Sequence, residues 1–203
     1  MNPNFGILVL AAGKSRRFGS DKLLAPMPDG RPLISHSLAP LQEMAKRYDL
    51  KLCVVTRASN HELISYLLEN DISYTEYPDT KDPDNAQGIG HSIAHGIKAN
   101  SLWQGWMIAL ADMPNLTANI VEVLITHIIQ SPHQIVRPSI SKENKETPLH
   151  PVYFPQSYKL KLSELTGDSG AKNIIQQQKL INISNANLLI DIDTTADLFN
   201  LKL

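Results

Sequence analysis

The sequence is poor in cysteine and has no long hydrophobic run. Its single cysteine, Cys53, cannot form a disulfide within the chain, and its position in the apolar run 52–55 is typical of a small buried side chain rather than a nucleophile. No apolar stretch approaches the about 18 residues that a membrane-spanning helix needs, and the N-terminus lacks the basic and then apolar pattern of a signal peptide. We therefore expect a cytoplasmic protein with no membrane partner.

The sequence also lacks an excess of either charge. It has 19 Lys+Arg against 20 Asp+Glu, which gives a net charge of −1. This balance argues against polymeric nucleic acid or an anionic membrane as the main partner, so local clusters must carry the electrostatics. A length of 203 residues fits a single α/β domain over 1–203, which buries about 70% of its unfolded surface.

Short apolar runs alternate with longer amphipathic segments, which predicts a parallel sheet covered by helices on both faces. The predicted strands are Phe5–Leu10, Lys51–Thr56, Ile72–Glu76, Trp106–Ala111, Gln134–Pro138, His150–Phe154, Leu180–Ile183 and Leu188–Ile190. The predicted helices are Pro32–Tyr48, Ser59–Glu69, Gly90–Ala99, Thr117–Ile129, Ser169–Gln178 and a closing helix with Thr194 as its N-cap. The polar stretch Ser141–Thr147 is predicted to be a mobile loop that could act as a lid.

The stretch 8–22 is the most informative part of the chain. A buried strand runs into the small residues 11–13, and two arginines, a second glycine and Lys22 follow. Gly13 and Gly19 allow backbone N–H groups to point into one concavity, while Arg16, Arg17 and Lys22 supply cationic donors for phosphate oxygens. The spacing matches neither a Walker loop nor G-x-G-x-x-G. We interpret the stretch as a polyphosphate site; the alternative is a surface turn with solvated arginines.

A second candidate element is the strand that ends at Asp112. Ligands of open parallel sheets bind outside the carboxyl ends of the strands, so Asp112 and the turn after Leu10 can face one crevice. A carboxylate would repel phosphate unless a divalent cation lay between them, and Mg²⁺ binds one or two carboxylates plus phosphate oxygens. Asp112 is therefore the predicted Mg²⁺ ligand, with a turn-capping role before Pro114 as the alternative.

Two further patterns are weaker. His91 and His95 are four residues apart on a predicted helix, as zinc ligands can be, but no third ligand accompanies them. Ser92 and His150 could form a hydrolytic triad with an aspartate, but Ser92 does not lie in the G-x-S-x-G turn that carries a hydrolase nucleophile. A helix cap or a pocket donor is the better interpretation of Ser92.

Seven motifs occur in the order found in one known family, and together they cover nearly the whole chain. They are L-A-A-G-x-S-x-R-F-G-x-x-K at 10–22, G-R-P-L-I at 30–34, G-I-G-H-S-I at 88–93, L-A-D-M-P at 110–114, H-P-V at 150–152, G-D-S-G-A at 167–171 and D-I-D-T-T-A-D-L at 191–198. With them the chain resembles the MobA-like nucleotidyltransferases, and among these the molybdenum cofactor cytidylyltransferases.

The resemblance implies a Rossmann-like three-layer α/β fold of the nucleotide-diphospho-sugar transferase type. It implies transfer of a nucleoside monophosphate from a triphosphate to a phosphorylated acceptor, with Arg17, Lys22 and Asp112 as catalytic residues. The other roles it implies are base and ribose contacts for Leu10, Ala11, Ala12 and Gly13, triphosphate contacts for Arg17 and Lys22, a nucleotide-pocket turn at Gly90 and Ser92, Mg²⁺ ligation by Asp112 with Asp191 or Asp193, and acceptor contacts for His150, Pro151, Asp168 and Gly170.

Two differences from related sequences bear on which nucleotide and which acceptor the protein uses. Guanylyl-transferring relatives tend to have Ala-Gly-Gly at 11–13, and the methyl group of Ala12 favours a pyrimidine, hence CTP; a guanylyltransferase that uses GTP is the alternative. Leu149 stands where the cytidylyltransferases usually have glycine, so the acceptor could be molybdopterin, another pterin or a sugar phosphate. An apo-molybdoenzyme or its chaperone is implied as a further partner. A non-catalytic module that holds a nucleotide-bearing cofactor is the third hypothesis.

Overall fold

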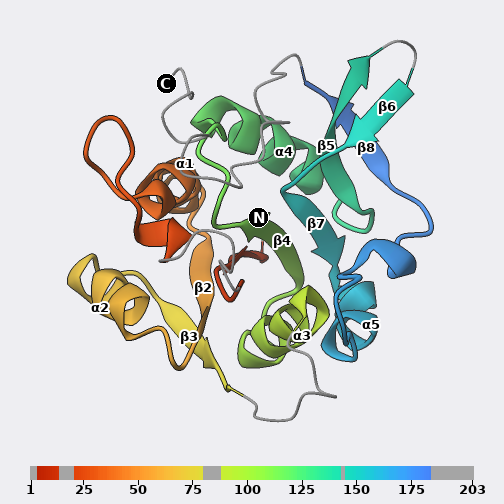
Figure 1. Ribbon diagram of the computed structural model, residues 1–203. Coiled ribbons are helices and arrows are strands. Elements are labelled where there is room, and N and C mark those ends of the chain that lie inside the picture. Colours follow the sequence, from red (N-terminus) through yellow and green to blue (C-terminus); the bar gives the residue numbers. More distant parts are fainter. Residues whose placement is uncertain (1–3, 14–20, 80–87, 143–144, 184–203) are drawn as a thin grey trace.

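The protein is a three-layer α/β molecule with one mixed sheet at its centre (Figure 1). The structure, a computed structural model, describes residues 4–13, 21–79, 88–142 and 145–183. The sheet has the strand order β3-β2-β1-β4-β7-β5-β6, and β8 pairs with β5. Its strands are β1 (Gly6–Leu10), β2 (Lys51–Arg57), β3 (Tyr74–Tyr77), β4 (Gly105–Leu110), β5 (Val136–Lys142), β6 (Lys145–Pro148), β7 (Val152–Pro155) and β8 (Lys179–Asn182).

Most neighbouring strands are parallel. The first four strands pair in parallel, as do β5 and β8, whereas β7 runs antiparallel to both β4 and β5 and β6 runs antiparallel to β5. The predicted mostly parallel three-layer α/β fold is therefore confirmed. The α-helices are α1 (Leu33–Arg47), α2 (His61–Glu69), α3 (Ile89–Ala99), α4 (Ala118–Gln130) and α5 (Lys159–Ser163), and the 3₁₀ turns are η1 (Lys22–Leu24), η2 (Gln156–Tyr158) and η3 (Lys172–Ile174).

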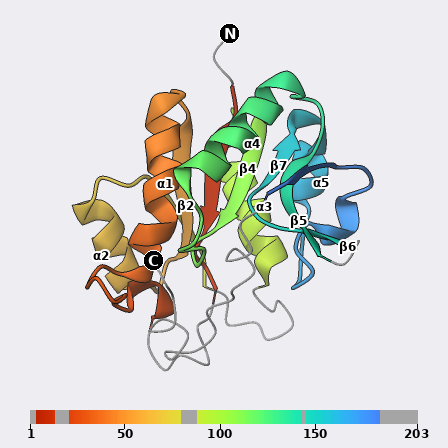
Figure 2. The same ribbon diagram turned by 90° about the horizontal axis from the view of Figure 1, so that it is seen from above.

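The sheet separates two hydrophobic cores, and β1 contributes to both. Ile7 and Val9 pack into the core formed with α1, α2 and α4, whereas Leu8 and Leu10 pack into the core formed with α3 and α5. This alternation follows from the opposite orientation of successive side chains in a strand. Figure 2 shows α1 and α4 in front of the sheet, with α3 and α5 behind it. None of the described helices is long and apolar enough to cross a membrane.

Helices and strands with strong apolar periodicity lie close to their predicted positions. The helix expected to be capped by Thr117 is α4, and Thr117 Oγ1 accepts a hydrogen bond from Ile120 N at 3.4 Å. The helices expected at 32–48, 59–69 and 90–99 correspond to α1, α2 and α3. The predicted strand 188–190 and the closing helix lie outside the described residues.

Two predictions are wrong. The expected loop Ser141–Thr147 instead includes the end of β5 and most of β6, which form an antiparallel hairpin with Ser141 opposite Glu146. Polar edge strands pair through their backbones and need no apolar face, so the sequence shows no periodicity there. The expected helix Ser169–Gln178 contains only the 3₁₀ turn η3, because Gly170 has a φ of +56° and the following glutamines have no apolar face to bury.

Candidate active site

The carboxyl ends of β1 and β4 bring two predicted site residues together. The strands are parallel neighbours with Leu10 opposite Leu110, and Ala111 N donates to Leu10 O at 3.1 Å. Lys22 follows the loop after β1, and Asp112 comes shortly after β4. Lys22 Nζ lies 3.1 Å from Asp112 Oδ2. The structure therefore places this cation and this carboxylate at the same edge of the sheet.

The 3₁₀ turn η1 holds Lys22 in place. Asp21 caps the turn by accepting a hydrogen bond from Leu23 N at 3.0 Å. Its second oxygen accepts one from Asn60 Nδ2 at 2.6 Å, which ties η1 to the start of α2. The Lys22 side chain is 12% exposed and that of Asp112 is 40% exposed. Lys22 is thus anchored, whereas Asp112 is open to a ligand.

A cavity of about 250 Å³ lies beside this pair. Because residues 11–13 carry a methyl group or no side chain, a ligand in the cavity can approach the backbone closely. Most of the predicted nucleotide contacts line it. The lining residues are Leu10, Ala11, Ala12, Gly13, Lys22, Leu23, Gly88, Ile89, Ser92, Leu110, Ala111 and Asp112.

Arg57, which sequence reasoning missed, fixes the backbone of this cavity. It ends β2 with 7% of its surface exposed, and its Nε donates to Ala12 O at 2.6 Å. Arg57 Nη1 lies 3.6 Å from Asp79 Oδ1, while the other oxygen of Asp79 accepts a hydrogen bond from Ser59 N at 2.8 Å. A charged residue at the end of the apolar strand Leu52–Thr56 was the available signal.

The N-terminus of α3 packs directly on the loop that carries two predicted acceptor residues. Gly90 N donates to Gly167 O at 2.9 Å, and a Cβ at Gly90 would lie 2.6 Å from Thr166 O. His91 Nδ1 accepts a hydrogen bond from Gly167 N at 3.2 Å. Gly90 therefore serves close packing of helix and loop; the residues lining the cavity include its neighbours Ile89 and Ser92 but not Gly90 itself.

A second cavity, of about 460 Å³, adjoins the first and shares Leu10 and Ile89 with it. His150, Asp168 and Gly170 line it, as the acceptor prediction requires of residues in one place. Pro151 is buried directly before β7, follows a cis peptide bond, and is not among the lining residues. The remaining lining residues are Ile93, Ile108, Arg137, Pro148, Val152, Phe154, Ser169, Ala171, Lys172 and Ile175.

Two side chains that line the second cavity, His150 and Arg137, have lowered pKa values. The pKa of His150 is lowered to about 4, chiefly by burial and also by the charge of Arg137, while a hydrogen bond with the Ile108 backbone and the charge of Asp112 oppose the shift. Burial also lowers the pKa of the Arg137 guanidinium, which stays charged at any ordinary pH. His150 is therefore a neutral hydrogen-bonding group near neutral pH.

The residues present fit a single Mg²⁺ ion held by Asp112. A cation already lies 3.1 Å from its carboxylate in the form of the Lys22 amine, and Mg²⁺ needs one or two carboxylates when substrate phosphates supply the other ligands. Within the described ranges, no group of three or more His, Cys, Asp or Glu is placed to hold a metal. His95 Nε2 instead lies 2.9 Å from Thr75 Oγ1, so the zinc alternative gains no support.

Some predicted site residues fall outside the described ranges. They are Arg16, Arg17, Gly19, Asp191 and Asp193.

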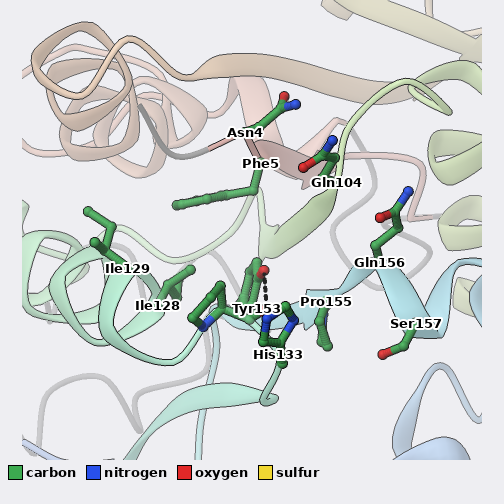
Figure 3. Close-up of a pocket in the computed structure, with 11 residues that line it drawn as sticks. Asn4, Phe5, Gln104, Ile128, Ile129, His133, Tyr153, Pro155, Gln156 and Ser157 are labelled. Carbon is green, nitrogen blue, oxygen red and sulfur yellow. Dashed lines mark hydrogen bonds between the residues drawn. The ribbon is translucent and has the colours of Figure 1, made fainter. Parts of the chain in front are cut away.

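A third cavity, of about 930 Å³, lies at the opposite edge of the sheet, where β1 and β4 begin (Figure 3). Phe5 and Tyr153 lie on its floor as an edge-to-face pair with centroids 5.3 Å apart. Tyr153 Oη donates to Pro132 O at 2.9 Å, and burial raises the pKa of Tyr153 to about 12. None of the predicted site residues lines this cavity.

Comparison with known proteins decides the family. The model of the MobA-like NTP transferase domain matches residues 7–181. The chain belongs to this family. The match includes both the Lys22–Asp112 pair and the second cavity, so the site described above lies within an NTP transferase domain.

Two relatives of this MobA-like domain are similar to it in sequence over two thirds or more of their length. The chain is 30% identical to the purine catabolism protein PucB of Bacillus subtilis over 91% of this chain and 89% of that protein. It is 28% identical to a probable molybdenum cofactor guanylyltransferase of Pyrococcus horikoshii, over 71% of this chain and 67% of that protein.

Among solved structures, that of Rv0371c from Mycobacterium tuberculosis aligns with a TM-score of 0.76 at 18% identity and covers 96% of this chain and 95% of that one. A manganese complex of Rv0371c aligns with a TM-score of 0.69 at 17% identity, covering the same shares. At these identities the likeness shows the fold, which is that of the nucleotide-diphospho-sugar transferases.

Proposed function

We propose that this MobA-like transferase moves CMP from CTP onto the phosphate of molybdopterin and releases pyrophosphate. The observation that carries the proposal is the meeting of Lys22 and Asp112, 3.1 Å apart, beside a cavity walled by small residues. A second cavity adjoins the first, so a nucleotide and an acceptor can lie side by side.

The main obstacle to this reaction is charge repulsion between the anionic acceptor phosphate and the anionic triphosphate. An oxygen of the acceptor phosphate attacks the α-phosphorus of the triphosphate and forms a new P–O bond. The bond from the α-phosphorus to the bridging oxygen breaks, and pyrophosphate leaves with its electron pair. The acceptor phosphate is largely ionised near neutral pH, so no general base is needed. No covalent protein intermediate is needed either, since positioning and charge neutralisation lower the barrier.

Lys22 and Arg17 are the proposed cationic contacts of the triphosphate. Lys22 is held by the capped turn η1, which preorganises its charge before the substrate arrives. Asp112 is the proposed Mg²⁺ ligand, with Asp191 as a second. When bound, Mg²⁺ supplies positive charge to the phosphate oxygens and the leaving pyrophosphate.

The proposed preference for CTP depends on Ala12. Its side chain is buried, with 3% exposed, and it lines the nucleotide cavity. A methyl group there leaves less room beside the base than glycine does, which favours a pyrimidine. GTP is the second candidate, because the Pyrococcus relative bears the name guanylyltransferase.

The proposed acceptor site is the second cavity. His150, Asp168 and Gly170 line it, and Pro151 is proposed to shape it from behind. Molybdopterin is the favoured acceptor, and another pterin or a sugar phosphate would use the same catalytic residues. The product would pass to an apo-molybdoenzyme or its chaperone, and we place the protein in the cytoplasm.

The test is a pyrophosphate-release assay with the purified protein, Mg²⁺, molybdopterin and each of CTP, GTP, ATP and UTP. We expect release with CTP above the other three and no release without molybdopterin. A clear preference for GTP would overturn the nucleotide assignment and leave the reaction class intact. Tight nucleotide binding without release in any combination would instead support a non-catalytic module that carries a cofactor.

A further inference from the structure

Arg137 belongs to none of the motifs that pointed to the family, yet it lies in the wall of the second cavity. It is the second residue of β5, and its side chain is partly buried. Arg137 Nε donates to Leu149 O at 2.9 Å. That one bond orients the guanidinium and leaves its four terminal N–H donors for other partners.

Among the residues that the structure describes, no carboxylate lies within ion-pair distance of this guanidinium. The ion pairs found among the described residues use the side chains of Lys22, Arg31, His36, Arg47 and Arg57, and Arg137 is in none of them. Asp168 lines the same cavity, but its side chain is exposed and makes no ion pair with Arg137. A partly desolvated cation without a counter-charge is costly for a fold, and an anionic ligand removes that cost.

The walls around Arg137 are largely apolar. Ile93, Ile108, Val152 and Phe154 belong to the buried core on this side of the sheet and also line the cavity. Such a surface suits a flat ring or a hydrocarbon body, whereas the hydroxyl groups of a sugar would find few partners there. The cavity thus combines a partly buried cation, Arg137, with an apolar wall, while its other cation, Lys172, is exposed.

His150 adds a polar group at the same place. Its Nδ1 is buried and has no hydrogen-bond partner among the described residues. Arg137 and Asp112 both act on its charge, so the ring lies within electrostatic reach of the second cavity's cation and of the carboxylate beside the first cavity. A ligand atom that bonds Nδ1 would satisfy this orphaned group.

We propose that Arg137 binds the phosphate of the acceptor and that the second cavity selects phosphorylated compounds with a flat or apolar body. This inference rests on the proposed function in taking the bound compound to be the acceptor. Guanidinium groups bind two oxygens of a phosphate at once, which leaves the third terminal oxygen of the acceptor phosphate free to attack. Arg137 is therefore a residue that sets acceptor specificity.

The first test measures binding without turnover. Phenyl phosphate, phenol and inorganic phosphate are titrated separately into protein with ¹³C-labelled isoleucine methyl groups. The methyl signals of Ile93 and Ile108 report on the second cavity, because neither residue lines the first. We expect phenyl phosphate to shift these signals at lower concentration than phenol or phosphate does. Arg137→Gln should weaken phenyl phosphate binding at least about tenfold, and Arg137→Lys by less, because lysine keeps the charge but not the fork.

Lys98→Gln on α3 is the control, because Lys98 is an exposed cation that lines neither the first nor the second cavity; it should change binding by less than about threefold. Circular dichroism verifies that each variant is folded. If Arg137→Gln does not fold, the comparison of Arg137→Lys with wild type decides. Binding that is equal in wild type and a folded Arg137 variant would overturn the proposal, as would a preference for phenol over phenyl phosphate.

The second test uses the full reaction. In pyrophosphate-release assays Arg137→Gln should raise the KM for molybdopterin at least about tenfold and leave the KM for the nucleotide within twofold. A rise in the nucleotide KM alone would show that Arg137 acts on the nucleotide and not on the acceptor, which would overturn the proposal. If the wild-type protein releases no pyrophosphate with any acceptor, the proposed function fails, while the methyl titration still decides what Arg137 binds.

Discussion

Lys22 and Asp112 are separated by 90 positions in the chain, yet Lys22 Nζ and Asp112 Oδ2 lie 3.1 Å apart at the carboxyl edge of the sheet. The parallel pairing of β1 with β4 brings the carboxyl ends of the two strands together, and the capped turn η1 holds Lys22 at that edge. At such a site the cation can bind a phosphate and the carboxylate can bind a metal ion.

Loss of either partner of this pair should nearly abolish activity. Lys22→Ala and Asp112→Ala should each lower kcat by at least about a hundredfold, because each removes a preorganised charge from the transition state. Pyrophosphate release at saturating nucleotide and acceptor measures the effect.

Exposed residues of the same types provide the controls for that experiment. Lys46→Ala and Glu43→Ala on α1 should keep the wild-type rate. Near-normal turnover in Lys22→Ala or in Asp112→Ala would refute the role assigned to that residue.

The sequence was sufficient to predict the parts of the fold that depend on apolar periodicity. The buried strands β1, β2 and β4 and the amphipathic helices α1 and α4 lie within a few residues of their predicted bounds. Their side chains face two cores on opposite sides of one sheet, so the sequence pattern and the packing carry the same information.

Elements held by backbone pairing or by long-range contacts could not be predicted in this way. In the hairpin of β5 and β6, Ser139 Oγ donates to Glu146 Oε1 at 2.8 Å, a contact between polar residues that no periodicity signals. The segment after Gly170 has helix-forming residues but little beyond Ile174 and Ile175 to pack against a core, and only η3 forms.

The same distinction applies to the candidate site: some of its residues could be predicted from the sequence, and others depend on contacts between distant segments. Lys22 and Asp112 could be singled out because a turn and a strand end carry them. Arg57 could have been noticed as a charge at the end of an apolar strand, but its role depends on Ala12 O, which lies on another segment. Arg137 could not be singled out, because it acts through Leu149 O, also on another segment. Only the folded chain places such donors and acceptors together.

Replacement of Ala12 should change the choice of nucleotide. Ala12→Gly removes a buried methyl group from the nucleotide cavity and makes room for a larger base. We expect the ratio of kcat/KM for GTP to that for CTP to rise about tenfold, the scale of discrimination that one methyl group provides. Ala99→Gly, an exposed change of the same type at the end of α3, should leave the ratio unaltered. An unchanged ratio in Ala12→Gly would show that residue 12 does not select the base.

Arg57 should act on nucleotide binding more than on the chemical step. Arg57→Met removes the donor to Ala12 O and loosens the backbone that lines the nucleotide cavity, so the KM for the nucleotide should rise about tenfold with a smaller change in kcat. Arg57→Lys, which can still donate, should recover part of the loss. Arg47→Met removes an exposed arginine paired with Glu122 on the other side of the sheet and should alter neither constant. Equal falls in kcat and kcat/KM for Arg57→Met would contradict a positioning role.

His150 should make the folded state sensitive to acid. Its pKa is about 4 in the folded protein, chiefly because burial disfavours the charged ring, against about 6.5 in an unfolded chain. Above pH 6.5 the ring is neutral in both states, and its contribution to stability is fully present. Between pH 6.5 and 4 the unfolded chain binds a proton that the folded protein does not, so this contribution is lost as the pH falls.

Urea unfolding of wild type and His150→Gln at pH 7.5, 5.5 and 4.5 measures the difference. His150→Gln should lose less stability across that range than wild type, whereas His61→Gln, an exposed histidine on α2, should follow the wild-type profile. The same acid response in wild type and His150→Gln would show that the ring takes up its proton as readily in the folded protein as in the unfolded chain.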